Sequence, residues 1–391
     1  MKITFVFDGL TMGGIEKVGI NYCKLLKKMG HEVSVINLQP NKDDLENEMK
    51  EQSEIYYFSY HRKMIYQRYV KLIEYGILGA FFYAFICFFL CIFMIIKKMY
   101  ARLKFRRLND TDLLVAFSGH FNDLSFVGKC FIKTKKKIAW LHGAQFSYKM
   151  DSEGFFPLYK RIKNLVCLSE FADASCQKFN TANNIKKYKI YNPIFLGERK
   201  TDEKKIEKLQ RQYGKFLLMV GRLEDDKDQI TAIRAVQYLK EKYGCDLRLL
   251  LVGGGSKKEY LQNYIKENHL ESNVYLTGQC SDVQNYYEAA YIYVHSSPME
   301  GLPTVLLEAM MHKLPIAATD SIPGVREILG DSECGLLAKV SNPKDLGEKI
   351  YLLYNDMDLR NQMVERGCER IKDFLPDAIE RKLSEMLRNI D

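Results

Sequence analysis

The sequence predicts an α/β protein built from two domains. At 391 residues the chain is long enough for two domains of ordinary size, each with its own core. Short apolar runs of strand character alternate with helical segments, and glycine-rich turns follow several of them, as Gly253-Gly254-Gly255 follows Leu249 to Val252. An apolar fraction of 47% with 27% charged residues is typical of a globular chain rather than a disordered one.

Charge and cysteine usage narrow the class of protein. The net charge of +9 is compatible with nucleic acid, an anionic membrane or an anionic substrate as a partner. No nucleic-acid-binding motif is recognisable, so we expect no nucleic-acid partner. The ten cysteines, from Cys23 to Cys368, lack the spacing of metal ligands or of a disulfide cluster, and no signal peptide precedes Lys2. These features predict a protein of the reducing cytosol.

The chain opens with a predicted parallel strand and a glycine-rich turn. Ile3 to Asp8 has the composition of a buried strand, and Gly13 and Gly14 lie between it and the first helix. Such a turn lets a phosphate approach the free amides of the helix start, although a tight turn needs glycine even without a ligand. A second strand, Glu32 to Leu38, gives this region βαβ character.

An apolar segment interrupts the first domain. Gly76 to Ile96 carries no charged residue, and about 20 helical residues would span a hydrocarbon core of roughly 30 Å. A basic run suited to anionic lipid headgroups follows, comprising Lys97, Lys98, Arg102, Lys104, Arg106 and Arg107. A single crossing would place strands Ile3 to Phe7 and Leu113 to Phe117 on opposite sides of a membrane. We therefore predict a helix or short re-entrant hairpin that dips into the cytoplasmic leaflet, rather than a single span or a wholly buried core helix.

Later strands of the first domain bring a histidine to the edge of the sheet. Asp112 to Gly119 resumes the sheet, and Lys137 to Leu141 leads directly to His142. Ligands bind at the carboxyl ends of strands in open α/β sheets, so His142 is a candidate site residue. A hydrogen-bonded structural histidine is the alternative. After a further strand and turn at Leu165 to Glu170, the polar segment Gly197 to Lys205 is a plausible linker.

Two cations follow the first strand of the second domain. Phe216 to Val220 leads into a loop that carries Arg222 and Lys227. Arg222 can bind a diphosphate through its planar guanidinium, and Lys227 can bind it as a point charge. Fixed cations at this place would also stabilise negative charge that develops on a diphosphate leaving group. The alternative is an exposed, salt-bridged turn.

The segment around which the second domain is organised is a strand-to-helix turn. Tyr291 to Val294 has the composition of a strand, and Val305 to Met311 starts an apolar helix. Between them Gly301 permits a close backbone approach, and Pro303 suits the first helical position. Glu300 and Glu308 flank these helix amides, with Glu308 about 7.5 Å along the helix from Pro303. Amides favour a phosphate and carboxylates accept hydrogen bonds from hydroxyls, so a nucleotide sugar would satisfy the whole element.

Together these motifs resemble the retaining family 4 glycosyltransferases of the GT-B fold. Glu300 to Glu308 is similar to the Glu-x7-Glu signature of that family, and Gly13-Gly14-Ile15-Glu16 resembles its Gly-Gly-x-Glu loop. The loop from Gly221 to Lys227 resembles the family's Gly-Arg-Leu-x3-Lys-Gly, with Asp228 in place of the final glycine. The resemblance covers nearly the whole chain apart from roughly residues 60–107.

The resemblance implies two Rossmann-like parallel-sheet domains that face a cleft, with a membrane-associated hydrophobic helix inserted in the first. The implied divisions are an acceptor-side domain at 1–195 with its insertion at 60–107, a donor-binding domain at 206–370, and a helix at 371–391 that crosses back to the first domain. The implied catalytic residues are His142, Glu300, Arg222 and Lys227. The implied donor-binding residues are Gly13, Gly14, Arg222, Lys227, Gly253, Thr277, Glu300, Gly301, Leu302, Pro303, Thr304 and Glu308.

The implied reaction transfers a hexose or N-acetylhexosamine, with retained configuration, from a nucleotide diphosphate sugar. UDP is the expected carrier, and the expected acceptor is a lipid-linked sugar at the cytoplasmic face of the plasma membrane, used for capsule, O-antigen or related glycans. We expect no cofactor and no metal, because Asp110-Thr111-Asp112 precedes a strand and so lies at the wrong end of the sheet. Two alternatives are a glycolipid-forming enzyme and a non-catalytic subunit that binds a nucleotide sugar.

Overall fold

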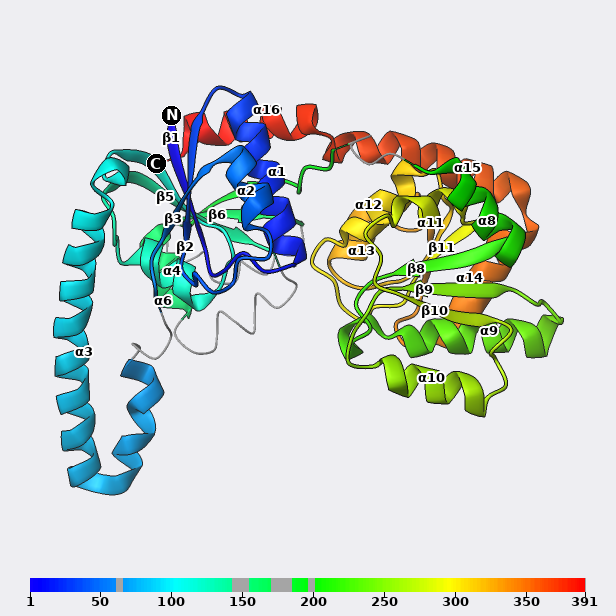
Figure 1. Cartoon of the computed structure of the whole chain (residues 1–391), viewed down its shortest axis with the longest axis horizontal. Coiled ribbons are helices and arrows are strands. Elements are labelled where there is room, and N and C mark those ends of the chain that lie inside the picture. Colours follow the sequence, from blue (N-terminus) through cyan, green and yellow to red (C-terminus); the bar gives the residue numbers. More distant parts are fainter. Residues whose placement is uncertain (61–65, 143–154, 170–184, 196–200, 391) are drawn as a thin grey trace. The chain divides into compact units, whose positions relative to one another are not determined.

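The chain folds into two compact units. The computed structural model describes residues 1–60, 66–142, 155–169, 185–195 and 201–390. Unit 1 comprises Met1–Pro193 with Ile379–Asp391, and unit 2 comprises Ile194–Ala378 (Figure 1). Each unit is built on one parallel sheet flanked by helices, so the predicted α/β class with two Rossmann-like sheets is confirmed.

The sheet of unit 1 has the strand order β3-β2-β1-β4-β5-β6-β7. Its strands are β1 (Lys2–Phe7), β2 (Glu32–Asn37), β3 (Glu54–Tyr57), β4 (Thr111–Ala116), β5 (Thr134–Leu141), β6 (Asn164–Cys167) and β7 (Lys186–Lys189). In β1 and β2 every residue after the first is buried. Continuous apolar runs of this kind suit parallel strands, because helices cover both faces of the sheet.

Unit 1 also contains helices, several of which cover the two faces of its sheet. They are α1 (Gly14–Lys28), α2 (Glu46–Gln52), η2 (Tyr66–Tyr75), α3 (Gly76–Lys104), η3 (Arg106–Leu108), α4 (Phe121–Gly128), α6 (Phe155–Ile162) and α16 (Pro376–Asn389). On one face, Tyr22 of α1 packs edge-on against Trp140 of β5. On the other, Phe105 and Phe126 belong to one buried cluster with Val6 of β1.

The apolar segment forms a helical hairpin that ends beside the core. Figure 1 shows η2 running out and α3 returning as a long helix on the flank of unit 1. The stretch Tyr69–Lys104 is long and apolar enough to cross a membrane, and only 6% of its most apolar window is buried. Nevertheless β1 pairs directly with β4, as at Ile3 and Leu113. Because one crossing between these strands would separate them, the pairing is incompatible with a single span.

A glycine lets the two arms of the hairpin meet. A Cβ on Gly79 would lie 1.9 Å from the carbonyl oxygen of Leu72, far inside van der Waals contact. Gly79→Ala is therefore expected to force η2 away from α3 and to speed amide exchange in residues 69–75, measured by hydrogen-exchange mass spectrometry in detergent. Leu78→Ala is the control, since Leu78 is 72% exposed. Unchanged exchange in Gly79→Ala would show that the arms are not held by this contact.

The sheet of unit 2 has the strand order β10-β9-β8-β11-β12-β13. Its strands are β8 (Phe216–Val220), β9 (Arg248–Val252), β10 (Val274–Gly278), β11 (Ile292–His295), β12 (Ile316–Thr319) and β13 (Leu336–Ala338). Its helices are α8 (Glu203–Tyr213), η4 (Asp225–Lys227), α9 (Gln229–Tyr243), α10 (Lys258–Glu267), α11 (Gln284–Ala289), α12 (Thr304–Met311), α13 (Gly324–Leu329), α14 (Pro343–Asn355), α15 (Met357–Arg370) and η5 (Ile371–Phe374). Strand order reverses between β8 and β11, and the loops that follow these two strands therefore share the edge where ligands bind in such sheets.

Candidate functional site

The loops after β8 and β11 bring a lysine and a glutamate together at the carboxyl edge of the unit 2 sheet. Lys227 Nζ donates to Glu300 Oε1 at 2.6 Å, and the two side chains are only 21% and 12% exposed. The backbone of Glu300 is held as well, because Gly324 N donates to its carbonyl oxygen at 3.0 Å. The predicted pair thus forms one half-buried, charged contact.

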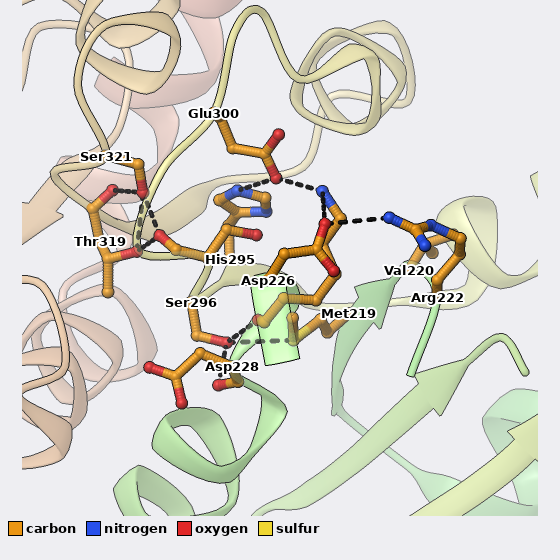
Figure 2. A network of polar contacts seen from close by, with 12 residues as sticks. Met219, Val220, Arg222, Asp226, Asp228, His295, Ser296, Glu300, Thr319 and Ser321 are labelled. Carbon is orange, nitrogen blue, oxygen red and sulfur yellow. Dashed lines mark hydrogen bonds and ion pairs between the residues drawn. The ribbon is translucent and has the colours of Figure 1, made fainter. Parts of the chain in front are cut away.

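A buried histidine lies beneath this pair. His295, the last residue of β11, is 1% exposed, and its Nε2 lies 3.5 Å from Glu300 Oε1. Figure 2 shows its ring beside the Glu300 carboxylate. Neither ring nitrogen makes a hydrogen bond to any residue that the structure describes. We therefore regard the 3.5 Å approach as an electrostatic contact rather than a hydrogen bond.

These neighbours fix the charge of Glu300. Burial alone raises the pKa of its carboxyl, but contact with His295 and then with Lys227 outweighs burial and lowers the pKa to about 2. The ordinary value is 4.5. Because the folded pKa is the lower one, ionised Glu300 stabilises the fold above pH 4.5, and this contribution disappears as the pH falls toward 2.

The wild type loses free energy of unfolding as the pH falls, and Glu300→Gln is expected to reduce this loss by about 3 kcal/mol. The measurement is urea unfolding of the full chain at a series of pH values between 5 and 2.5, monitored by circular dichroism. Glu241→Gln is the control, because Glu241 is an exposed carboxylate on α9. Equal pH dependence of the wild type and Glu300→Gln would contradict the assigned charge network.

A second acid stands between the two cations. Asp226 Oδ2 accepts from Arg222 Nη2 at 3.0 Å and lies 3.8 Å from Lys227 Nζ (Figure 2). The Arg222 side chain is 67% exposed, so it extends into solvent. The negative charge of Asp226 therefore lies where an anionic ligand of Arg222 and Lys227 would place its own charge.

Removal of this competing charge is expected to strengthen nucleotide binding. Asp226→Asn should lower the Kd for UDP about threefold to fivefold, since an exposed ion pair contributes up to about 1 kcal/mol. Isothermal titration calorimetry measures the change. Asp225→Asn serves as the control, because Asp225 pairs with Lys257 and not with the two site cations. Weaker binding by Asp226→Asn would mean that Asp226 orients Arg222 instead of competing.

The residue that departs from the family pattern keeps a glycine-like backbone. Asp228 has φ 47° and ψ 45°, a left-handed conformation that Asp tolerates better than most residues. Its carboxylate accepts from Thr231 Oγ1 at 2.7 Å. Its carbonyl accepts from Ser296 Oγ at 2.8 Å, as Figure 2 shows. The substitution therefore preserves the turn and ties the β8 loop to the β11 loop.

Further predicted donor residues surround the same edge of unit 2. Gly253 follows β9 with φ +151°, and a Cβ there would lie 1.9 Å from the Gly221 carbonyl oxygen. This glycine therefore serves backbone packing. Thr277 of β10 donates its hydroxyl to the Leu251 carbonyl at 3.3 Å.

The turn into α12 has the predicted order with one shift. Pro303 is the N-cap and Thr304 the first helical residue, whereas Pro303 was predicted at the first helical position. Leu302 is buried, and Gly301 and Glu308 are partly buried. Glu308 lies beside Tyr287. Burial, and then the charge of this carboxylate, raise the pKa of Tyr287.

In unit 1 the predicted residues lie at the carboxyl edge of the sheet, His142 directly after β5 and the two glycines at the start of α1. His142 Nε2 is 2.7 Å from the carbonyl oxygen of Phe117, so this nitrogen carries the hydrogen and donates it. Gly13 is the N-cap of α1 and Gly14 its first residue. The Glu16 carboxylate turns back toward Gly13, since a Cβ on Gly13 would meet Glu16 Oε2 at 2.4 Å. This acid already lies at the predicted anion site of the helix start.

A polar cluster that sequence reasoning missed lies at the same edge of unit 1. Asp8, which follows β1, accepts from Asn122 Nδ2 at 2.7 Å and from Gln39 Nε2 at 2.8 Å, and its other oxygen is 3.3 Å from His120 Nδ1. Nearby Asp123 is fully buried, and burial raises its pKa to about 7. In unit 2, Asp226 and His295 were also missed. His295 could have been found, because it stands at the carboxyl end of a predicted strand, as His142 does.

The described residues hold no group of three or more His, Cys, Asp or Glu side chains arranged for a metal ion. Asp112 of the Asp-x-Asp triplet lies in β4 at the amino end of the sheet. It pairs there with Lys135 Nζ at 2.7 Å and accepts from Lys2 N at 2.8 Å. These contacts account for the triplet structurally.

Comparisons with known proteins agree with the fold and the motifs. Residues 200–370 match the model of the family described as glycosyl transferases group 1. An uncharacterized glycosyltransferase of Haemophilus influenzae is 28% identical over 95% of this chain and 95% of its own length. A Campylobacter jejuni protein is 25% identical over 96% of this chain and 94% of its own. It is named an N-acetyl-D-galactosaminyltransferase for a GalNAc-containing PP-undecaprenol substrate.

Solved structures share the architecture. The HepE protein of Anabaena, crystallised with UDP, superposes with a TM-score of 0.74 at 18% identity, over 100% of both chains. This likeness shows that the chain has the GT-B fold. Residues 200–370, which make up most of unit 2, therefore carry the sequence pattern of the group 1 glycosyl transferases, and relatives named glycosyltransferases align with nearly the whole chain.

Proposed function

We propose that this protein transfers a hexose or N-acetylhexosamine from a UDP-sugar to a lipid-linked sugar at a membrane surface, with retained configuration. The observation that carries the proposal is the contact between Lys227 and Glu300, which joins a phosphate-binding cation to a hydroxyl-binding carboxylate at the carboxyl edge of unit 2. The UDP bound to HepE supports the choice of nucleotide.

The chemistry follows from the charges in unit 2. As the bond between the sugar and the diphosphate breaks, negative charge grows on the diphosphate, and Arg222 and Lys227 stabilise it. When the diphosphate draws Lys227 away, Glu300 becomes able to accept hydrogen bonds from sugar hydroxyls. The acceptor hydroxyl then attacks from the same face, and its proton passes to the leaving phosphate oxygen. Glu308 binds the ribose in this proposal, and His142 acts at the sugar.

The acceptor class rests on two supports. The Campylobacter relative is named for a substrate linked to undecaprenol through a diphosphate. In this chain, the hairpin of η2 and α3 exposes large apolar side chains, such as Phe81 at 69% and Phe85 at 53%. Such a surface favours insertion into one leaflet, and a cytoplasmic enzyme would insert from the cytoplasmic face. The products would serve cell-surface polysaccharides such as capsule or O-antigen.

The test is a donor panel on detergent-purified full-length protein. UDP- and GDP-linked hexoses and N-acetylhexosamines are supplied with and without a short-chain polyprenyl-diphosphate sugar, and nucleotide release is measured with and without EDTA. Anomeric configuration of the product is read by NMR. Arg222→Ala and Glu300→Ala should abolish release, whereas Lys257→Ala should leave it unchanged.

The outcomes separate the alternatives. Release of UDP that rises with the lipid-linked sugar and persists in EDTA supports the proposal. A product of inverted configuration would contradict retention. Nucleotide binding without any sugar release, from every donor, would favour a non-catalytic subunit.

A further inference from the structure

A cavity of about 400 Å³ lies in unit 1 where α3 joins the body of the unit. Its apolar lining comes from Met94 and Ile95 of α3 and from Phe131, which follows α4. Besides Gly128, the remaining lining consists of three cations, namely Lys98 of α3, Lys129 after α4 and Arg161 of α6. The cavity therefore combines an apolar surface with positive charge drawn from three separate helical segments.

The charges in this cavity are not balanced by acids. No carboxylate among the residues that the structure describes forms an ion pair with Lys98, Lys129 or Arg161. Burial, and then the charge of Arg161, lower the pKa of Lys129. Like charges held this close repel one another, and an anion between them would relieve the repulsion.

The position of the cavity along α3 says which anion fits. Met94 packs against the core of unit 1, and Lys97 Nζ donates to the Ser59 carbonyl at 2.8 Å, so the helix is fixed to the unit here. Before this point α3 exposes its apolar side chains, and Phe89 is still 52% exposed. Lys98 lies about 13 Å further along the helix than Phe89. If the exposed part enters a leaflet, the cavity lies at the depth of the lipid headgroups.

We propose that this cavity binds the phosphate group of an anionic membrane phospholipid, with the acyl chains of that lipid lying along the exposed apolar side of α3. The proposal rests on the membrane placement proposed above. Lys129 and Arg161 contact the phosphate, and Lys98 closes the site from the helix. Binding at this place fixes unit 1 against the membrane through one specific lipid in addition to the general apolar insertion.

The test uses the full chain in a nonionic detergent with dihexanoyl-phosphatidylglycerol as the probe, measured by calorimetry. We expect saturable binding of one molecule, reduced at least tenfold in Lys129→Gln/Arg161→Gln and retained in Lys129→Arg. The control is Lys133→Gln/Lys135→Gln, which removes the same charge from exposed positions at the start of β5. Thermal unfolding of every variant verifies that it is folded.

Three outcomes would overturn the proposal. If the double variant bound the probe as tightly as the wild type, the lipid would bind elsewhere. If dihexanoyl-phosphatidylcholine bound as tightly as dihexanoyl-phosphatidylglycerol, the site would not select for a net negative charge. Inorganic phosphate that binds as tightly as the lipid would identify a site for a soluble anion. Donor hydrolysis in the same detergent reports on the glycosyltransferase proposal independently, since the cavity residues are not part of the donor site.

Discussion

Lys227→Met is expected to lower sugar transfer roughly 10²- to 10³-fold, the usual effect of removing one group that stabilises transition-state charge. The same change leaves the Glu300 carboxylate, which is 12% exposed, without its ammonium partner. Loss of one partner of a largely buried ion pair destabilises a fold by up to about 3–5 kcal/mol, and the His295 ring that stays beside Glu300 offsets part of this cost. The variant should therefore lose both turnover and stability, measured as kcat for nucleotide release and by urea unfolding.

A double variant separates these two effects. Lys227→Met/Glu300→Gln removes both charges and should recover most of the lost stability while turnover stays low. Lys257→Met is the matched control, because Lys257 pairs with Asp225 at 2.8 Å in an exposed contact that contributes less than about 1 kcal/mol. Normal turnover in Lys227→Met would remove Lys227 from the catalytic set.

Three substitutions on the apolar hairpin are expected to release the protein from membranes. Phe81, Phe85 and Phe89 follow one another at helical spacing on α3 and are 69%, 53% and 52% exposed. Replacing all three with Asp removes apolar area and adds three charges, each costing about 2.5–3.5 kcal/mol at the depth of a hydrocarbon core. Vesicle partitioning should fall more than a thousandfold.

The measurement is co-sedimentation of the full chain with vesicles of phosphatidylcholine and phosphatidylglycerol. The triple Phe→Leu variant is the control, because it keeps the apolar character, and it should bind as the wild type does. Donor hydrolysis in detergent should be unchanged in both variants, since these side chains lie in unit 1 outside the donor loops. Undiminished vesicle binding by the Asp variant would mean that the hairpin does not enter the bilayer.

Much of the fold was predictable because it depends on local sequence. The strands of both sheets are short apolar runs such as Phe216–Val220, buried on both faces and ended by glycine or polar turns. Such runs identify parallel strands without knowledge of their partners. The topological argument for the apolar segment also needed only the pairing of β1 with β4, which the structure contains.

The placement of individual side chains was harder to predict. The resemblance to family 4 enzymes identified Lys227 and Glu300 as site residues. It did not predict that these side chains, 73 residues apart in the sequence, contact each other. Asp226 was not among the predicted site residues, although it lies beside both cations. The roles of His142 and of the Gly13-Gly14 turn stay predictions.

The sequence by itself determined the α/β class, the division into strands and helices, the apolar segment and the family motifs, because periodicity and turn chemistry are local properties. Only the tertiary structure decided which charges meet. His295 lies beneath Glu300 because β11 ends beside β8 at the reversal of strand order, and Lys129 approaches Arg161 because α3, α4 and α6 pack on one flank. Such contacts depend on strand order and helix packing, which bring together residues that no local pattern relates.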